Sequence, residues 1–129
     1  MIEPRPTDGE LAILRVLWSH GPSTVREVHD VLLETKDTAY TTVLKMLTIM
    51  AEKGLLTRDE SERSHRYSAV HAEARVQGSL VRDLLDRAFD GSALLLVQRA
   101  LDTRAADPEE LDAIAALIAE ARRKQRRRP

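Results

Sequence analysis

The 129-residue sequence predicts a mainly α-helical fold with one small β-hairpin. Aromatic residues make up only 3% of the chain, and its apolar content comes mostly from Leu, Ala and Val, a profile typical of helices rather than of a β-sandwich. Apolar residues recur at helical spacing along most of the chain, and only one short stretch after Gly54 has the strand pattern. The length fits one domain, or a small domain with an appended helical segment.

The first predicted helix begins at Thr7, because Thr7 and Glu10 have the spacing of a capping box. It ends near His20, since Gly21 and Pro22 stop a helix. Apolar residues cover much of its circumference, which places it in the centre of a small domain. These residues are Leu11, Ile13, Leu14, Val16, Leu17 and Trp18.

The second predicted helix is short and follows a tight linker. Either Ser23 or Thr24 caps it, and it runs from Val25 to about Leu33. Its inward residues are Val28, Val31 and Leu32. A polar break over residues 36–38 then separates it from the next helix.

The third predicted helix begins at Thr38 or Ala39 and ends at Lys53-Gly54, where the glycine suits a left-handed cap. Its apolar side holds Tyr40, Val43, Met46, Leu47 and Met50. Its narrow polar side holds Thr41, Lys45, Thr48 and Glu52, flanked by Leu44 and Ile49. Hydroxyls, one cation and exposed aliphatic groups suit a DNA groove, although an ordinary amphipathic core helix shares this periodicity.

After Gly54 the pattern changes to strands. Two strands are expected at residues 55–58 and 65–69, joined by a polar turn over residues 59–64. Three short helices form a helix-turn-helix arrangement, and a hairpin directly after the third helix is a wing. A generic surface hairpin is the alternative, but Arg63 and Arg66 favour contact with a phosphate strand.

From His71 onward the chain predicts three more helices. The first ends near Asp90-Gly91, the second follows Ser92, and the third opens at Asp107-Pro108 with an N-cap and a first-turn proline. Their apolar surface exceeds what they can bury against one another, so a second copy of the chain is the expected partner. The candidate dimer contacts are Leu80, Leu84, Leu95, Leu111, Ile114 and Ile118.

The predicted architecture is therefore a winged helix-turn-helix followed by a C-terminal helical dimerisation region. Residues 1–71 form the winged-helix DNA-binding domain and residues 72–129 the dimerisation region. The candidate DNA-binding residues are Tyr40, Thr41, Thr42, Lys45, Thr48, Arg63, His65 and Arg66. A winged-helix protein–protein adaptor without sequence-specific DNA binding is the alternative function.

The charge balance does not by itself indicate nucleic acid as a partner. The net charge is −1, and residues 1–70 hold nine Lys or Arg against eleven Asp or Glu, so the local placement of cations must carry any DNA contact. The clearest basic run is residues 122–128. This run fits either a solubilising helix end or a DNA arm.

Several other classes of protein are not expected. With no cysteine there is no disulfide, thiolate metal site or cysteine nucleophile. The chain has no apolar leader or membrane-spanning run, so we expect a soluble cytoplasmic protein without membrane contact. No phosphate loop or hydrolase motif indicates an enzyme or a cofactor. His65, His71 and Glu73 lack a further ligand at suitable spacing, so no metal site is expected.

The motifs as a set resemble the penicillinase-repressor family, the BlaI/MecI-type winged-helix regulators. The set begins with a Leu-rich helix that ends in Trp18. Four motifs follow it: TVREVHDVL (24–32), AYTTVLKML (39–47), EKGLL (52–56) and SHRYSAV (64–70). The resemblance implies a homodimeric repressor that binds a palindromic operator in double-stranded DNA through its third helix and wing. The family motif matches at Thr42, Leu47 and Lys53-Gly54.

Several departures from the family pattern bear on function. Many members have Arg where this chain has Ile49, and the wing carries three acidic residues that would repel a phosphate if they faced it, Asp59, Glu60 and Glu62.

In antibiotic-responsive members a peptidase, acting after a membrane-bound sensor detects the drug, cuts at an Asn-Phe pair, but Arg99-Ala100 takes that position here. A pocket shaped for Asn and Phe loses its discrimination on Arg and Ala, so a different peptidase or another signal is expected. The cysteine pairs of copper-responsive relatives are absent.

Overall fold

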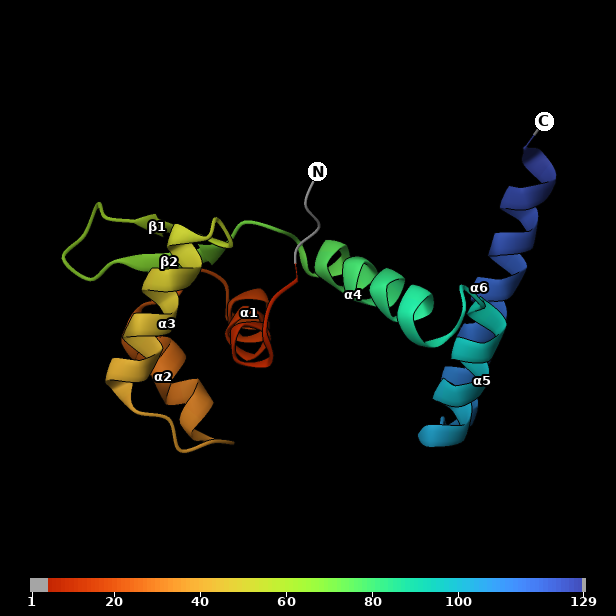
Figure 1. Ribbon diagram of the computed structural model, residues 1–129, viewed down its shortest axis with the longest axis horizontal. Coiled ribbons are helices and arrows are strands. Elements are labelled where there is room, and N and C mark those ends of the chain that lie inside the picture. Colours follow the sequence, from red (N-terminus) through yellow and green to blue (C-terminus); the bar gives the residue numbers. More distant parts are fainter. Residues whose placement is uncertain (1–4, 129) are drawn as a thin grey trace. The chain divides into compact units, whose positions relative to one another are not determined.

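The computed structural model describes residues 5–128 and divides into two compact units, Met1–Asp83 and Leu84–Pro129. The elements in chain order are α1 (Asp8–His20), α2 (Val25–Leu33), α3 (Tyr40–Glu52), β1 (Leu56–Asp59), β2 (Arg66–Ala69), α4 (Glu73–Ala88), α5 (Ala93–Thr103) and α6 (Pro108–Arg127) (Figure 1). Helices with a single two-stranded antiparallel sheet confirm the predicted fold class. The boundary between the two units falls between Asp83 and Leu84, within α4. The division by function into residues 1–71 and 72–129 stays a prediction.

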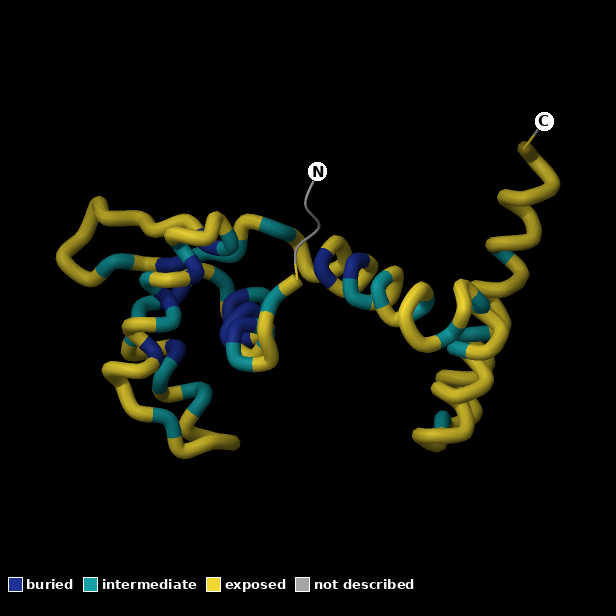
Figure 2. The backbone as a smooth tube through the Cα atoms, in the orientation of Figure 1, coloured by how far each residue is buried: buried dark blue, intermediate teal, exposed yellow. Residues whose placement is uncertain are grey.

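The first unit has one core, to which α1, α2, α3 and both strands contribute. Figure 2 shows the buried positions gathered on the inner sides of these elements. The core residues are Ile13, Leu14, Val16, Leu17, Val28, Val43, Leu47, Met50, Leu56 and Tyr67. One placement from the helical periodicity was wrong: Tyr40 is 42% exposed, because it begins α3 at the edge of the core. Its ring instead packs edge-on against His29, with ring centroids 5.6 Å apart.

Both α1 and α2 begin with a complete capping box, which fixes where each helix starts. Thr7 and Glu10 bond each other's backbone amides at the start of α1, and Thr24 and Glu27 do the same at the start of α2. Ser23, the other candidate cap of α2, instead pairs with Tyr67 of β2 through two backbone hydrogen bonds of 3.1 and 2.8 Å. The segment between α1 and α2 is thereby attached to the edge of the hairpin.

The predicted end of α3 is confirmed, and it has a partner that the sequence did not indicate. Gly54 takes the left-handed conformation after Lys53. The Lys53 Nζ lies 2.6 Å from Oε2 of Glu10, which is itself buried. Burial of this carboxyl favours a higher pKa, but hydrogen bonds from Lys53 and from the Thr7 amide outweigh it, so the pKa of Glu10 lies below its ordinary value. The ion pair joins the end of α3 to the start of α1.

The hairpin follows as predicted, with each strand beginning one residue later than expected. Its register pairs Leu56 with Ala69 and Asp59 with Arg66. The first turns of α4 also belong to this unit, since Val76 is 1% exposed and the indole Nε1 of Trp18 donates to the His71 carbonyl at 3.0 Å. The entry into α4 is therefore fixed to α1.

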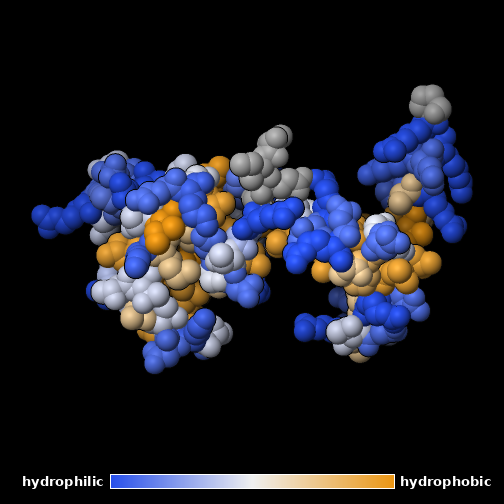
Figure 3. Space-filling view, in the orientation of Figure 1, coloured by the Kyte–Doolittle hydropathy of each residue, from blue (hydrophilic) through white to orange (hydrophobic). Residues whose placement is uncertain are grey.

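The second unit has no comparable core. It contains the end of α4, α5 capped by Ser92 and α6 capped by Asp107, as the sequence predicts. None of the residues of α5 or α6 is buried, and apolar side chains lie at the surface of this unit (Figure 3). Leu94 is 76% exposed and Leu117 is 70% exposed. No helix within residues 5–128 has the length and apolar content needed to cross a membrane.

Candidate nucleic-acid interface

The outward face of α3 offers donors without competing acids. Thr41 and Lys45 are exposed, and no acidic residue occurs in α3 before Glu52. Among the described residues, Lys45 has no ion-pair partner. Ala39 caps the helix without a side-chain hydrogen bond, so the amides of the first turn are not occupied by a capping side chain. This end of a helix attracts anions, because its amides and dipole are both positive.

Thr48 lies on the same face but is partly engaged. Its hydroxyl donates to the Leu44 carbonyl one turn earlier at 2.9 Å. The donor is thus used within the helix, and Thr48 keeps only acceptor capacity for a base edge. Ile49 is 40% exposed and presents an aliphatic group beside these polar side chains.

A cleft of about 440 Å³ separates the start of α3 from the wing. Its lining comes from three regions: Thr24, Val25 and Arg26 at the start of α2, Tyr40 and Leu44 of α3, and Arg63, Ser64, His65 and Tyr67 of the wing. None of these nine residues is acidic, whereas two are arginines and one is a histidine. The cleft therefore concentrates positive charge that the near-neutral total conceals.

The sequence-based site divides into three groups in the structure. Tyr40, Arg63 and His65 meet in the cleft. Thr41, Lys45 and Thr48 lie along the exposed face of α3. Thr42 is separate from both, because it lines a depression of about 290 Å³ between α1, the end of α2 and α3, together with Gly9, Ala12, Ile13, Leu32, Lys36, Asp37, Thr38, Ala39 and Met46.

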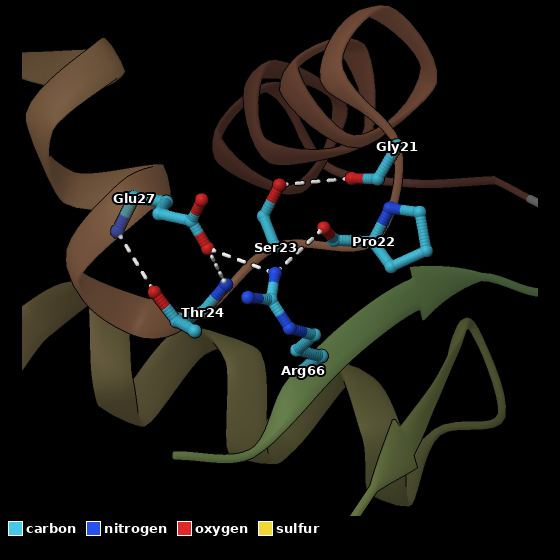
Figure 4. A network of polar contacts seen from close by, with 6 residues as sticks. All are labelled: Gly21, Pro22, Ser23, Thr24, Glu27 and Arg66. Atoms are coloured by element: carbon cyan, nitrogen blue, oxygen red, sulfur yellow. Dashed lines mark hydrogen bonds and ion pairs between the residues drawn. The ribbon is translucent and has the colours of Figure 1, made fainter.

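Arg66 is the candidate whose surroundings differ most from the expectation of a free phosphate contact. Its Nη1 lies 3.2 Å from Oε1 of Glu27 and donates to the Pro22 carbonyl at 3.4 Å (Figure 4). The Thr24 amide and, to a lesser extent, the Arg66 guanidinium hold the pKa of Glu27 below its ordinary value, so this carboxyl is ionised at neutral pH. Arg66 therefore already has an anionic partner.

Arg26 is a cleft residue that the sequence analysis did not select. It lies in the first turn of α2, is exposed, and has no ion-pair partner among residues 5–128. The helical pattern of α2 marks Arg26 as a surface residue and nothing more. Only the return of the wing to the start of α2, through the pairing of Ser23 with Tyr67, brings Arg26 close to Arg63.

The acidic residues of the wing do not line the cleft. The Asp59 carboxylate accepts a hydrogen bond from the Ser61 amide at 2.9 Å, which holds the pKa of Asp59 below its ordinary value. Glu60 pairs with Arg58 at 3.2 Å. Two of the three acids are therefore bound within the hairpin itself.

A histidine of α2 supports the turn that leads into α3. His29 Nε2 lies 2.8 Å from the Thr38 carbonyl, a hydrogen bond that holds the turn before α3 when this nitrogen carries the proton. The described part of the chain holds no group of three or more His, Asp or Glu placed for a metal ion, so His65, His71 and Glu73 do not form one.

The residues selected for self-association lie in both units. Leu80 is half-buried on the part of α4 in the first unit. In the second unit Leu84, Leu95, Leu111 and Ile118 are between 41% and 51% exposed, and Ile114 is half-buried. Their exposure leaves apolar surface available on α4, α5 and α6.

The chain is similar to known proteins over most of its length. The model of the penicillinase repressor family matches residues 6–120. Transcriptional regulator BlaI of Mycobacterium tuberculosis (strain ATCC 25618 / H37Rv) is 37% identical over 115 residues, which cover 88% of this chain and 82% of that protein. The penicillinase repressor of Bacillus licheniformis is 24% identical over 117 residues, which cover 91% of each.

Two similar solved structures each match 57% of the chain. One is the solution structure of monomeric Bacillus licheniformis BlaI in complex with the blaP half-operator, with a TM-score of 0.50 and 27% identity over 57% of this chain and 90% of that one. The other is the DNA-binding domain of the repressor BlaI, with a TM-score of 0.51 at the same identity and coverage. The likeness covers a DNA-binding winged helix.

Proposed function

This chain belongs to the penicillinase repressor family and is a DNA-binding transcriptional repressor, and we propose that it acts as a homodimer on an inverted-repeat operator. The observation that carries the proposal is the acid-free cleft between α3 and the wing, beside the exposed face of α3. Positive side chains there suit a DNA backbone, and a neighbouring helix face of hydroxyls, one lysine and aliphatic groups suits base edges. The cytoplasm, where bacterial DNA lies, is the compartment that this function requires.

The two parts of the interface have different tasks in this proposal. Thr41, Lys45 and the acceptor of Thr48 read base edges from α3 in the major groove. Arg63, His65 and Arg26 contact phosphates across the cleft, with Tyr40 at its edge. Thr42 lines a separate depression, so it has no assigned DNA contact in this proposal.

The dimer is proposed because the exposed apolar surface of α5 and α6 needs a partner. Side chains as exposed as those of Leu94 and Leu117 are costly to leave in water when they gather on adjoining helices. A second copy related by a two-fold axis would cover them and would place two α3 helices on half-sites about one helical turn apart. Sedimentation at micromolar concentration tests this, and a monomeric full-length chain would overturn it.

The test of DNA recognition is a fluorescence-anisotropy titration of the full chain with its own upstream DNA. A scrambled duplex of equal length serves as the control, and both are measured at two salt concentrations. We expect preference for the native sequence and weaker binding to both duplexes at higher salt. Equal affinity for the two duplexes would favour a protein–protein adaptor.

We further propose that the repressor is released without the family's cut at an Asn-Phe pair. At the corresponding place Arg99 lies within α5, its guanidinium pairs with Asp102 at 2.9 Å, and its carbonyl accepts from the Thr103 hydroxyl. A β-lactam challenge of the native host, followed by immunoblotting, tests this. A fragment ending at Arg99 would contradict the proposal, and an intact chain agrees with a different peptidase or signal.

A further inference from the structure

The contact between Glu27 and Arg66 lies where the wing returns to the start of α2 (Figure 4). The carboxylate and guanidinium are 3.2 Å apart, and the two side chains are 54% and 45% exposed. Thr24, which forms the capping box with Glu27, lines the DNA-facing cleft, and so do His65 and Tyr67 on either side of Arg66. An acidic group thus holds a cation at the margin of a cleft that is itself free of acids.

The fold does not depend on this ion pair. Two backbone hydrogen bonds between Ser23 and Tyr67 already attach β2 to the segment before α2. The capping role of Glu27 uses the Thr24 amide and needs only a side-chain oxygen, not a charge. An exposed pair with a single close contact contributes little to stability, because solvent screens it. Its consequence is therefore electrostatic: it neutralises an arginine at the DNA-facing edge.

We propose that Glu27 competes with the DNA phosphate for Arg66 and so limits the affinity of the wing for DNA. This inference rests on the DNA-binding function proposed above. A phosphate that approaches the cleft must take Arg66 from Glu27 and leave that carboxylate unpaired beside a second anion. The loss of the contact between Arg66 and Glu27 partly offsets the gain from the contact between Arg66 and the phosphate. This offset is the same for any base sequence. Glu27 therefore restrains binding to operator and to random DNA alike.

The first test is Glu27→Gln in the full chain. Gln keeps an oxygen for the Thr24 amide, so α2 keeps its cap, but it removes the negative charge that attracts Arg66. We expect binding to operator and random duplexes to tighten by about threefold to tenfold, and the salt dependence to steepen by about one unit of slope for one regained phosphate contact. Weaker binding would overturn the proposal, since it would mean that the pair holds the wing in its binding position.

A double-mutant cycle with Arg66→Gln separates competition from simple repulsion between Glu27 and DNA. Competition requires Arg66, so the gain from Glu27→Gln should vanish in the Arg66→Gln background. An equal gain in both backgrounds would overturn the proposal. Glu34→Gln, at the other end of α2, is the matched control, because it removes the same charge without contact with Arg66 and should give a smaller gain.

The random duplex at low salt keeps this test separate from that of operator recognition. A wild-type chain that binds the random duplex but shows no preference for operator contradicts sequence-specific repression, while the cycle still measures competition for Arg66. A chain that binds neither duplex contradicts both. Unchanged affinity in Glu27→Gln, with operator preference intact, contradicts the competition alone.

Discussion

The two units of this chain use the same amphipathic helical pattern with opposite results. In the first unit, apolar faces of α1, α2 and α3 meet and enclose fully buried residues such as Val28 and Leu47. In the second, α5 and α6 together contain six leucines, and none of them is buried. Helical periodicity therefore predicts an apolar face that must be covered, and only the structure shows whether the same chain covers it.

The largest expected effect comes from separating the units. A fragment of residues 1–83 should keep its fold, because it retains the Trp18 to His71 hydrogen bond and the buried Val76. It should bind the operator about 10²- to 10⁴-fold more weakly than the full chain, since the second half-site is no longer tethered. Circular dichroism and anisotropy measure the two properties. Undiminished affinity would show that the second unit has no part in binding.

A pair of identical substitutions compares the buried and exposed leucines directly. Leu47→Ala should lower the free energy of unfolding of the first unit by about 2–5 kcal/mol at any protein concentration, because it leaves a cavity in a closed core. Leu117→Ala should instead weaken self-association. The difference in melting temperature between this variant and the wild type should therefore depend on protein concentration. Thermal melts over a range of concentrations distinguish these outcomes. Similar, concentration-independent losses would contradict the comparison.

Within the first unit the same contrast separates stability from binding. Lys45→Ala on the exposed face of α3 should cost about 1–3 kcal/mol of operator binding, roughly tenfold or more, and leave thermal stability nearly unchanged. Lys36→Ala, another exposed lysine in the turn before α3, is the matched control and should bind nearly as wild type. Parallel losses of folding and binding in Lys45→Ala would favour a role for this residue in the core.

The smallest expected effect concerns the ion pair between Glu10 and Lys53, which joins the start of α1 to the end of α3. Because the pKa of Glu10 is lower in the folded chain than its ordinary value of 4.5, its contribution to stability is present above that pH and is lost as the pH falls through the folded pKa. Glu10→Gln should therefore flatten the fall in melting temperature on acidification below about pH 4.5. Lys53→Gln should reproduce part of this flattening. Wild-type slopes in both variants would contradict the assignment.

What the sequence predicted well depends on residues close together in the chain. Both capping boxes join residues three positions apart, and the end of α3 depends on the adjacent Lys53 and Gly54. The pairs Glu10–Lys53 and Glu27–Arg66 join residues 43 and 39 positions apart, and no local pattern indicates them. The exposed face of α3 was predictable from periodicity for the same local reason.

The composition of the cleft could not be predicted, because its residues come from segments far apart in the chain. It depends on the wing lying against the start of α2, which the pairing of Ser23 with Tyr67 establishes. Arg26 joins the site only through that pairing. Tyr40 was assigned to the apolar side by an ideal helical wheel, which does not register that a first turn projects beyond the core.

The hydrogen bond from Trp18 to the His71 carbonyl also gives the chain a built-in optical reporter. Trp18 is the single tryptophan of the sequence, and its indole is half-buried where α1 meets the entry into α4. Breaking this bond would expose the indole to water and shift its emission to longer wavelength. Intrinsic fluorescence of the unlabelled protein therefore reports on this one junction. Titrating operator DNA into the protein would reveal whether DNA binding at α3 changes the surroundings of Trp18.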